Sequence, residues 1–337
     1  MRFDLYAELA SQTACPTEGS LPAGLASGFL DGCTSWFASK EIERAFAEAQ
    51  EKRAQSQPDR SQARERKNAA EREKNAARQR YMERASSPRL ELPSWLQLDP
   101  PFDRLPDSSW LAFEVMFTLE TPWYSKDDRP FHVLDNPLRK DRVFGVPYLA
   151  AASWKGLLRW ACQMQAGLLG YLEQHGGKLE SWSDPSWIVH LFGNEKGEAE
   201  EFQRGALAFY PTWFDKISFE VINPHSRKTR AGTQPIYYEV VPAGTEGTLR
   251  LLYAPLPSAA ARDKVTPGKA IERLLESVEV LLTTYGMSAK RTAGWGTASV
   301  SQWTAYRRGQ TPIQASALAD FKTKVKPWVS ATEAPRA

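Results

Sequence analysis

Large apolar side chains occupy every second position between Trp110 and Leu119. A period of two is typical of a β-strand with one buried face, so this segment predicts the first strand of a sheet. Similar apolar runs predict further strands at 206–210, 217–222, 236–241, 249–253 and 298–303. The turn-rich segment 242–247 predicts a hairpin that leads into the strand at 249–253.

Two other segments show the apolar spacing of amphipathic helices. The first begins at Ser153, a suitable N-cap, continues through Leu172 and ends near Gly176. The second covers 269–284. The order strand, helix, strand, strand, helix, strand predicts an α+β fold of the ferredoxin-like or RRM-like class. A sheet of this kind could present one face to RNA.

Changes in composition divide the chain into five segments. We expect an N-terminal arm, a charged helical extension, a proline-rich linker, the ferredoxin-like domain and a C-terminal tail, at residues 1–38, 39–92, 93–109, 110–306 and 307–337. Inside the domain, the segment 121–147 is rich in Pro, Asp, Arg and Gly and predicts a long thumb loop. Loops of this length are usually functional or disordered.

The charged extension consists mainly of strong helix formers with almost no large apolar residue after Phe46, so we expect helices without a buried stripe. Pro58 is expected to divide it into two helices, and the sequence Lys-Asn-Ala-Ala occurs at both Lys67 and Lys74. Two interpretations remain open. The extension is either a solvated helix with i,i+4 ion pairs, or a basic helix that lies on RNA phosphates or on a neighbouring subunit.

Composition narrows the classes of function. The 337 residues include 43 Lys and Arg against 40 Asp and Glu, so a basic surface for nucleic acid has to be local. Three widely spaced cysteines and four scattered histidines indicate neither a disulfide framework nor a zinc site. Because no apolar run approaches the roughly 18 to 20 residues of a membrane span and the start lacks a signal-peptide core, we expect a cytoplasmic protein without membrane contact.

Lys155 and Arg159 form the first candidate site. They are four residues apart, so they project from one face of the predicted helix start. The positive end of a helix favours phosphate, and the pair would make a clamp for an RNA backbone. Alternatively, both residues only solvate an amphipathic helix.

A glycine-rich loop near the end of the domain forms the second candidate site. Gly286, Gly294 and Gly296 surround Lys290 and Arg291. Backbone amides in such a loop can approach phosphates while the two cations neutralise them. The alternative is an ordinary turn, and the Walker pattern is absent.

The thumb loop contains the third candidate site. Asp135-Asn136-Pro137 is a good turn sequence, and a turn former is the simplest role for Asp135. The loop also carries several cations, among them Arg139 and Lys140, which we expect to contact RNA. A carboxylate beside bound RNA could orient a 2'-hydroxyl or hold a divalent cation. Three neighbouring acids compete for that role: Asp127, Asp128 and Asp141.

His225 lies at the end of a predicted strand and precedes three cations at 227–230. Such a ring next to cations can stack on a base or contact a phosphate. The alternative is that His225 caps the strand and the cations are solvated.

These segments, in this order, resemble the RAMP superfamily of CRISPR systems, in particular the backbone and head-end subunits of type III effector complexes. The first segment joins Asp135-Asn-Pro, Gly145-Val-Pro-Tyr148 and Ser153-Trp-Lys-Gly-Leu-Leu-Arg159. The others are the glycine-rich loop at 286–296 and Ile222-Asn-Pro-His225 with the later Val-Pro-Ala-Gly-Thr sequence. Where the family usually has Pro-Gly-Ser-Ser before the lysine, this chain has Ala-Ala-Ala-Ser-Trp.

The resemblance covers roughly residues 110–306 and implies an RRM-like fold, binding of guide RNA (crRNA) and assembly with other subunits of the complex. In the family's target-cutting members, an aspartate in the turn that matches Asp135 is needed for cleavage of target RNA. A divalent cation such as Mg²⁺ would accompany that cleavage, and no organic cofactor is implied.

Our leading hypothesis is therefore an RNA-binding subunit of a type III CRISPR effector complex. It would grip guide RNA through Lys155, Arg159, Lys290 and Arg291 and position the duplex with single-stranded target RNA. If Asp135 is active, the subunit would be an endoribonuclease. The alternatives are a non-catalytic capping subunit and a guide-RNA-processing ribonuclease of the same superfamily, whose general base would be the histidine at 225.

Overall fold

The computed structural model describes residues 26–86, 99–127, 132–141, 145–194, 203–224, 232, 235–256 and 264–330. The chain separates into two compact units. Unit 1 contains residues 1–92, 124–147 and 215–242, and unit 2 contains 93–123, 148–214 and 243–337. This division cuts across the expected domain at 110–306, because the thumb loop and the segment 215–242 group with the N-terminal helices.

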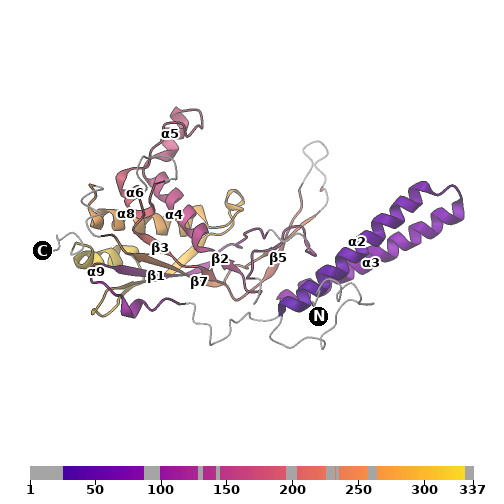
Figure 1. The fold of residues 1–337 in the computed structure, drawn as a ribbon, viewed down its shortest axis with the longest axis horizontal. Coiled ribbons are helices and arrows are strands. Elements are labelled where there is room, and N and C mark those ends of the chain that lie inside the picture. Colours follow the sequence, from indigo (N-terminus) through magenta and orange to yellow (C-terminus); the bar gives the residue numbers. More distant parts are fainter. Residues whose placement is uncertain are drawn as a thin grey trace. The chain divides into compact units, whose positions relative to one another are not determined.

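Unit 2 is built on a five-stranded antiparallel sheet (Figure 1). Its strands lie in the order β3-β7-β1-β8-β9. They are β1 Leu111–Leu119, β3 Leu207–Phe209, β7 Glu246–Tyr253, β8 Ala298–Tyr306 and β9 Ile313–Ala315. Along the chain, β1, α4, β3, β7, α8 and β8 follow the ferredoxin-like order, so the predicted fold class is confirmed.

The large apolar side chains that alternate along β1 pack against helices on one face of the sheet. Phe117 contacts Trp154 of helix α4 (Ala151–Gln165), with ring centroids 6.3 Å apart. Phe113 contacts Phe321 of helix α9 (Leu318–Ser330) at 6.4 Å. Both phenylalanines are at most 1% exposed, and burial of each side chain contributes roughly 1.5–3 kcal/mol. Helix α8 (Pro267–Val280) packs against both α4 and α9 to complete this layer.

The linker covers part of the opposite face of the sheet. Phe102, in the 3-10 helix η1 (Phe102–Arg104), and Leu105 form a small core with Ala112 of β1. Beside this core, Arg250 pairs with Glu114 at 2.9 Å, and Tyr306 donates a 2.5 Å hydrogen bond to the same carboxylate. The face expected to be open to RNA is therefore partly occupied by the protein's own linker.

Several expected boundaries are wrong for local reasons. Helix α4 is capped at Ala150, so Ser153 lies in its first turn, and Gly167 at φ 97° separates α4 from α5 (Leu168–Gln174). Another helix, α6, covers Ser186–Phe192, and α8 continues into a short π-helix at Leu281–Tyr285.

The hairpin expected across 242–247 is also wrong. Strand β6 (Ile236–Val240) pairs with β5 (Ser218–Ile222) in a separate two-stranded sheet, whereas β7 pairs with β1 and β3. The turn is stabilised instead by a hydrogen bond from the Gly244 amide to the Leu119 carbonyl at 2.7 Å. A further small sheet in unit 2 joins β2 (Tyr148–Leu149) to β4 (Thr212–Trp213).

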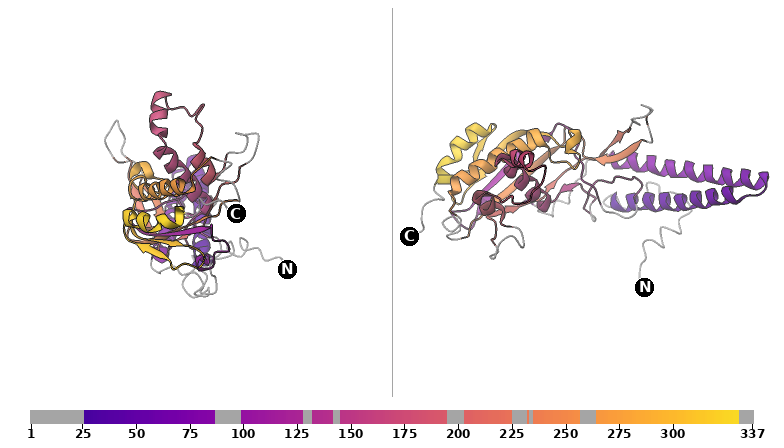
Figure 2. Two further views of the ribbon diagram at one scale, coloured as in Figure 1. Left: turned by 90° about the vertical axis from the view of Figure 1, so that its left-hand side faces the viewer. Right: turned by 90° about the horizontal axis from the view of Figure 1, so that it is seen from above.

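In unit 1, the charged extension and residues 26–38 of the expected arm form two long helices that lie side by side, α2 (Ala26–Arg53) and α3 (Gln57–Ser86) (Figures 1 and 2). The boundary expected at residue 39 therefore falls inside a helix. Their interface is lined by small side chains: Ala47, Ala63, Ala70, Ala77 and Ala85 are buried. The expectation that the extension has no buried stripe was therefore wrong, because a stripe of alanines carries little apolar bulk.

Ion pairs across this interface hold the helices in antiparallel register. Lys74 of α3 pairs with Glu41 of α2, and Lys67 pairs with Glu48 at 3.8 Å. Hydrogen bonds from Arg44 and Lys74 lower the pKa of Glu41 to about 2. The expected i,i+4 pairing is present as well, for example between Arg44 and Glu48 at 2.9 Å. Within the described ranges, no helix is long and apolar enough to cross a membrane.

Candidate nucleic-acid interface

Helix α4 in unit 2 presents Lys155 to solvent in its first turns. Its side chain makes no hydrogen bond or ion pair with any residue that the structure describes. The backbone amides at the start of a helix carry partial positive charge, which adds to that of the ammonium. Lys155 therefore remains available for an anion from solution.

Arg159, one turn later, is already engaged. Its guanidinium binds the Asp184 carboxylate, with Nη2 2.7 Å and Nε 2.8 Å from Oδ2. Gln163 and Trp182 also donate to Asp184, whose side chain is only 5% exposed. The structure thus gives Arg159 a protein partner in place of the expected phosphate, and it does not present Lys155 and Arg159 as one clamp.

The glycines of the second candidate site allow the loop to fold tightly on itself. Gly286, Gly294 and Gly296 have φ values of 75°, 79° and 88°, which disfavour other residues. A Cβ on Gly296 would overlap the backbone nitrogen of Ser288, and one on Gly286 would lie 2.8 Å from the Trp295 carbonyl oxygen. Close backbone packing therefore accounts for two of the three glycines without any phosphate.

The same loop places a cation on helix α4. The guanidinium of Arg291 lies 4.3 Å from the ring centroid of Trp160, which in turn packs edge-on against Tyr285 at 4.9 Å. One terminal nitrogen of Arg291 is buried and has no hydrogen-bond partner among the described residues, and burial lowers the pKa of the guanidinium. The structure thus brings the loop and the helix together through a stacked arginine with an unused donor, whereas Lys290 beside it is half-buried.

Unit 1 contains the third candidate site. Asp135 is exposed and pairs with no other residue in the described part of the chain. The next residue, Asn136, is fixed to strand β6. Its carbonyl accepts from the Glu239 amide at 3.1 Å, and its side-chain amide donates to the Tyr237 carbonyl at 3.2 Å. Arg139 is half-buried and donates to the Lys126 carbonyl at 3.4 Å.

Lys140 occupies a different environment from the one we expected. Its side chain is 2% exposed, and its ammonium lies 2.5 Å from Oε1 of Glu239 and 2.8 Å from the hydroxyl of Tyr81. A buried ammonium with a carboxylate partner has no exposed surface for phosphate, so we reassign Lys140 from an RNA contact to a structural ion pair.

Glu239 is the centre of this buried cluster. Besides Lys140, it accepts hydrogen bonds from the Tyr81 hydroxyl at 2.5 Å and from the Leu138 amide at 2.9 Å. Full burial by itself would raise the pKa of Glu239, but the charge of Lys140 and its other partners outweigh this effect and lower it. The carboxylate therefore stays ionised and joins α3, the thumb loop and β6, three segments far apart in the sequence.

His132 completes the cluster with a defined tautomer. Its Nδ1 accepts from the Leu134 amide at 3.1 Å, so that nitrogen carries no proton. Its Nε2 lies 3.0 Å from the Tyr81 hydroxyl, which already donates to Glu239. Nε2 therefore carries the proton and donates it. Anchors on both sides of Asp135 fix the backbone at this position of the loop and leave its carboxylate exposed.

Glu239 and Tyr81 were not among the residues predicted from the sequence. A carboxylate within the apolar strand Ile236-Tyr-Tyr-Glu-Val was a usable signal, because a charge in a half-buried strand needs a partner. Another candidate, His225, lies outside the described residues. Among the residues that are described, no group of three or more His, Cys, Asp or Glu could hold a metal ion.

The chain is similar to chains of several solved structures. In total, 195 chains of solved structures match. One of them belongs to the type III-B Cmr-beta complex bound to cognate target RNA. It is 15% identical with a TM-score of 0.48, and the match covers 82% of this chain and 92% of that chain. A chain of the Csm3-Csm4 subcomplex of the type III-A CRISPR-Cas interference complex matches with 15% identity and a TM-score of 0.40, over 65% of this chain and 95% of that chain. A chain of a CRISPR RNA-guided surveillance complex matches with 16% identity and a TM-score of 0.42, over 60% and 71%.

A search among curated proteins finds no match. The family model described as the RAMP superfamily matches residues 116–299, which is more than half of the chain. The matched region starts inside β1 and ends inside β8, and it therefore contains both candidate sites of unit 2 and the thumb loop of unit 1. The chain therefore belongs to the RAMP superfamily.

Proposed function

We propose that the chain is an RNA-binding subunit of a type III CRISPR effector complex, where it grips guide RNA and positions the duplex of guide and single-stranded target RNA. Its partners are crRNA, target RNA and the neighbouring subunits. Pairing between guide and target supplies the sequence specificity, and the protein reads backbone and shape.

The observation that carries this proposal is the packing of the glycine-rich loop on α4, with a cation on each of the two elements. Lys155 offers an unpaired ammonium near the positive end of α4, and the half-buried Arg291 places a second positive charge on Trp160 of the same helix. Gly156 lies one turn before Trp160 on the same helix face, and a Cβ there would meet nothing within 4 Å. A cation, a stacked guanidinium and an unobstructed helix surface together suit a sugar-phosphate backbone.

Substitution of these two cations tests the proposal. We expect Lys155→Ala and Arg291→Ala each to weaken binding of single-stranded RNA and to reduce the slope of log K against log salt by about 0.7 per lost phosphate contact. Lys178→Ala is the matched control, since Lys178 is also an exposed lysine of unit 2. Equal affinities for all three variants and the parent chain would contradict this assignment.

The RNA that copurifies with the protein tests its biological partner. Sequencing should recover repeat-derived guides when the protein is expressed with a CRISPR array. Recovery of bulk ribosomal or messenger fragments instead would contradict a guide-binding role.

Cleavage of target RNA is a second proposed function, because Asp135 is exposed on a loop that is anchored on both sides. The Asp135 carboxylate would accept the proton of a target 2'-hydroxyl, whose oxygen forms a bond to the adjacent phosphorus. The 5'-oxygen leaves and takes a proton from water, which gives a 2',3'-cyclic phosphate and a 5'-hydroxyl. A lone carboxylate does not make a metal site, so no step of this proposal runs through a metal ion.

Three substitutions separate the catalytic role from its alternatives. Asp135→Ala should abolish target cleavage with unchanged RNA affinity, whereas Asp141→Asn, on the same loop, should retain it; both are assayed with and without Mg²⁺. If the parent complex binds target and does not cut it, the chain is a non-catalytic capping subunit. If His225→Ala stops cleavage of precursor guide RNA, the chain is a processing ribonuclease.

A further inference from the structure

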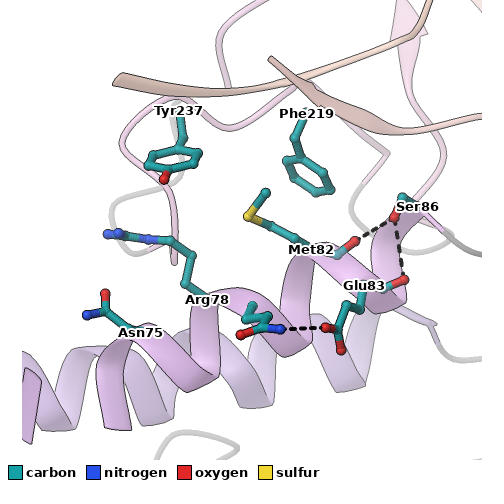
Figure 3. Close-up of a pocket in the computed structure, with 8 residues that line it drawn as sticks. Asn75, Arg78, Met82, Glu83, Ser86, Phe219 and Tyr237 are labelled. Carbon is teal, nitrogen blue, oxygen red and sulfur yellow. Dashed lines mark hydrogen bonds between the residues drawn. The ribbon is translucent and has the colours of Figure 1, made fainter. Parts of the chain in front are cut away.

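A cleft in unit 1 lies between helix α3 and the β5–β6 hairpin (Figure 3). Its volume is about 620 Å³, within the range of roughly 300–1,000 Å³ that is typical of ligand sites. Its lining residues come from two sources: Asn75, Arg78, Gln79, Met82, Glu83 and Ser86 from α3, and Phe219 and Tyr237 from the two strands. The resemblance to the RAMP superfamily does not extend to the helices that form one wall.

The wall formed by β5 and β6 is aromatic. Phe219 and Tyr237 are both half-buried, and in Figure 3 their rings face α3. Below them, the thioether of Met82 extends toward Phe219. Flat rings and a polarisable sulfur form a surface on which a planar aromatic ligand can stack.

The wall formed by α3 supplies hydrogen-bonding groups. Asn75 is exposed, and Gln79 donates from its side-chain amide to Glu83 at 2.8 Å. Amides offer both donors and acceptors, whereas the Glu83 carboxylate accepts from an exocyclic amine of a base. The same carboxylate repels phosphate, so the cleft selects a base over an anion.

Arg78 lines the cleft on α3, below Tyr237 in Figure 3, and is held by two aromatic rings. Its guanidinium lies 5.3 Å from the ring centroid of Phe37 in α2 and 5.6 Å from that of Tyr237 in β6. Its Nε is buried and has no hydrogen-bond partner among the described residues. The two rings fix the guanidinium at the cleft, where its terminal N–H groups can donate to a carbonyl oxygen or ring nitrogen of a base.

The surface of α3 that leads to the cleft favours a nucleic-acid strand. Helix α3 contains nine Lys and Arg against five Asp and Glu. On the solvent face that leads to Gln79, the exposed residues Arg64, Arg72 and Asn75 lie three to eight residues apart, with no carboxylate among them. Cations and amides along one face can contact the sugar-phosphate backbone of the nucleotides next to the bound base.

We propose that this cleft binds an unstacked nucleobase of single-stranded RNA, in a site separate from the α4 surface and carried by a different unit of the chain. The inference rests on the proposed RNA-binding function. It adds a second contact that the sequence analysis did not assign, and it gives the charged helical extension a role in RNA binding.

Paired asparagines provide a matched test. Asn75 and Asn68 are the same residue of the two Lys-Asn-Ala-Ala repeats, both are exposed on the same helix face, and only Asn75 lines the cleft. The full chain is titrated with a fluorescein-labelled 20-nucleotide single-stranded RNA. We expect Asn75→Ala and Tyr237→Leu to raise the Kd, the latter by about 5- to 100-fold, and Asn68→Ala to leave it nearly unchanged.

A cycle with abasic RNA makes the test specific for a base. RNA with an abasic site at the bound position should bind the parent chain about 5- to 100-fold more weakly than intact RNA. The Tyr237→Leu chain should bind both RNAs equally. Crosslinking of 4-thiouridine RNA should label the peptides that contain Phe219 or Tyr237, and thermal melting establishes that each variant is folded.

The outcomes distinguish failure of this inference from failure of the proposed function. If Lys155→Ala weakens RNA binding while the folded Asn75→Ala and Tyr237→Leu chains bind like the parent, only the cleft proposal is overturned. If AMP binds the cleft in an Asn75-dependent manner without any effect on RNA affinity, the site belongs to a free nucleotide, and the proposal is also overturned. If the parent chain binds no RNA, both proposals fail.

Discussion

Substitution of Glu239 by Gln tests whether the buried cluster stabilises the thumb loop. The change removes one charge and keeps the shape, so the Lys140 ammonium, with 2% of its side chain exposed, loses its carboxylate. Loss of one partner from a buried ion pair costs about 3–5 kcal/mol because the remaining charge is unpaired. A typical domain has a free energy of unfolding of only about 5–15 kcal/mol, so unit 1 should lose a large part of its stability.

Hydrogen exchange at the Leu138 amide is the appropriate assay, because a chain with two units is not expected to unfold in one two-state step. This amide donates to Oε2 of Glu239 at 2.9 Å. In Glu239→Gln its exchange should be faster by roughly two to nearly four orders of magnitude, which is the same energy expressed as a rate ratio. Peptides of unit 2 should exchange at the rate of the parent chain.

The double variant Lys140→Met with Glu239→Gln provides the control. Because Met at position 140 has no charge to leave unpaired, the double variant should lose less stability than the sum of the two single variants, by about 2 kcal/mol or more. Additive losses would refute the argument that the ion pair, and not only the packing, holds the loop.

The same cluster predicts how stability depends on pH. The pKa of Glu239 is lowered from 4.5 in the folded chain, so its carboxylate stabilises the fold fully above about pH 4.5 and loses this effect as the pH falls through the lowered value. The parent chain should therefore become less stable on acidification below pH 4.5, and the double variant should show a weaker dependence in that range.

Three further predictions concern other parts of the molecule. In thermal melts, Gly296→Ala should destabilise unit 2 by more than Gly294→Ala. Both glycines have positive φ, but only a Cβ at Gly296 would overlap the backbone of the loop. Equal decreases in melting temperature would contradict this account of the loop. Ala77→Leu adds a larger side chain at a buried position and should lower the free energy of unfolding by about 1–3 kcal/mol. Its helical signal should therefore be lost at lower urea concentrations than that of Ala69→Leu, where the residue is exposed. The thiol of Cys162 should resist alkylation at pH 8 until the chain unfolds, since burial raises its pKa to about 12, and rapid labelling of the native chain would refute this burial.

Local patterns in the sequence were sufficient for the fold class. Alternation in β1 depends only on which residues are apolar, and five large side chains in a period of two permit one buried face. The same holds for the apolar stripe of α8 and for the order of the strands and helices. The boundaries were less predictable, because caps and breaks depend on single residues such as Gly167.

The partners of the charged residues were decided only by the tertiary structure. The sequence placed Lys140 among loop cations and Arg159 on a helix face, and nothing near either residue indicated Glu239 or Asp184 as its partner. Those carboxylates are 99 and 25 residues away along the chain, and an ion pair depends on distance in space, not in sequence. For the same reason, the sequence could not show that Lys140 is buried and Lys155 is exposed. That difference depends on how the segments pack in the folded chain.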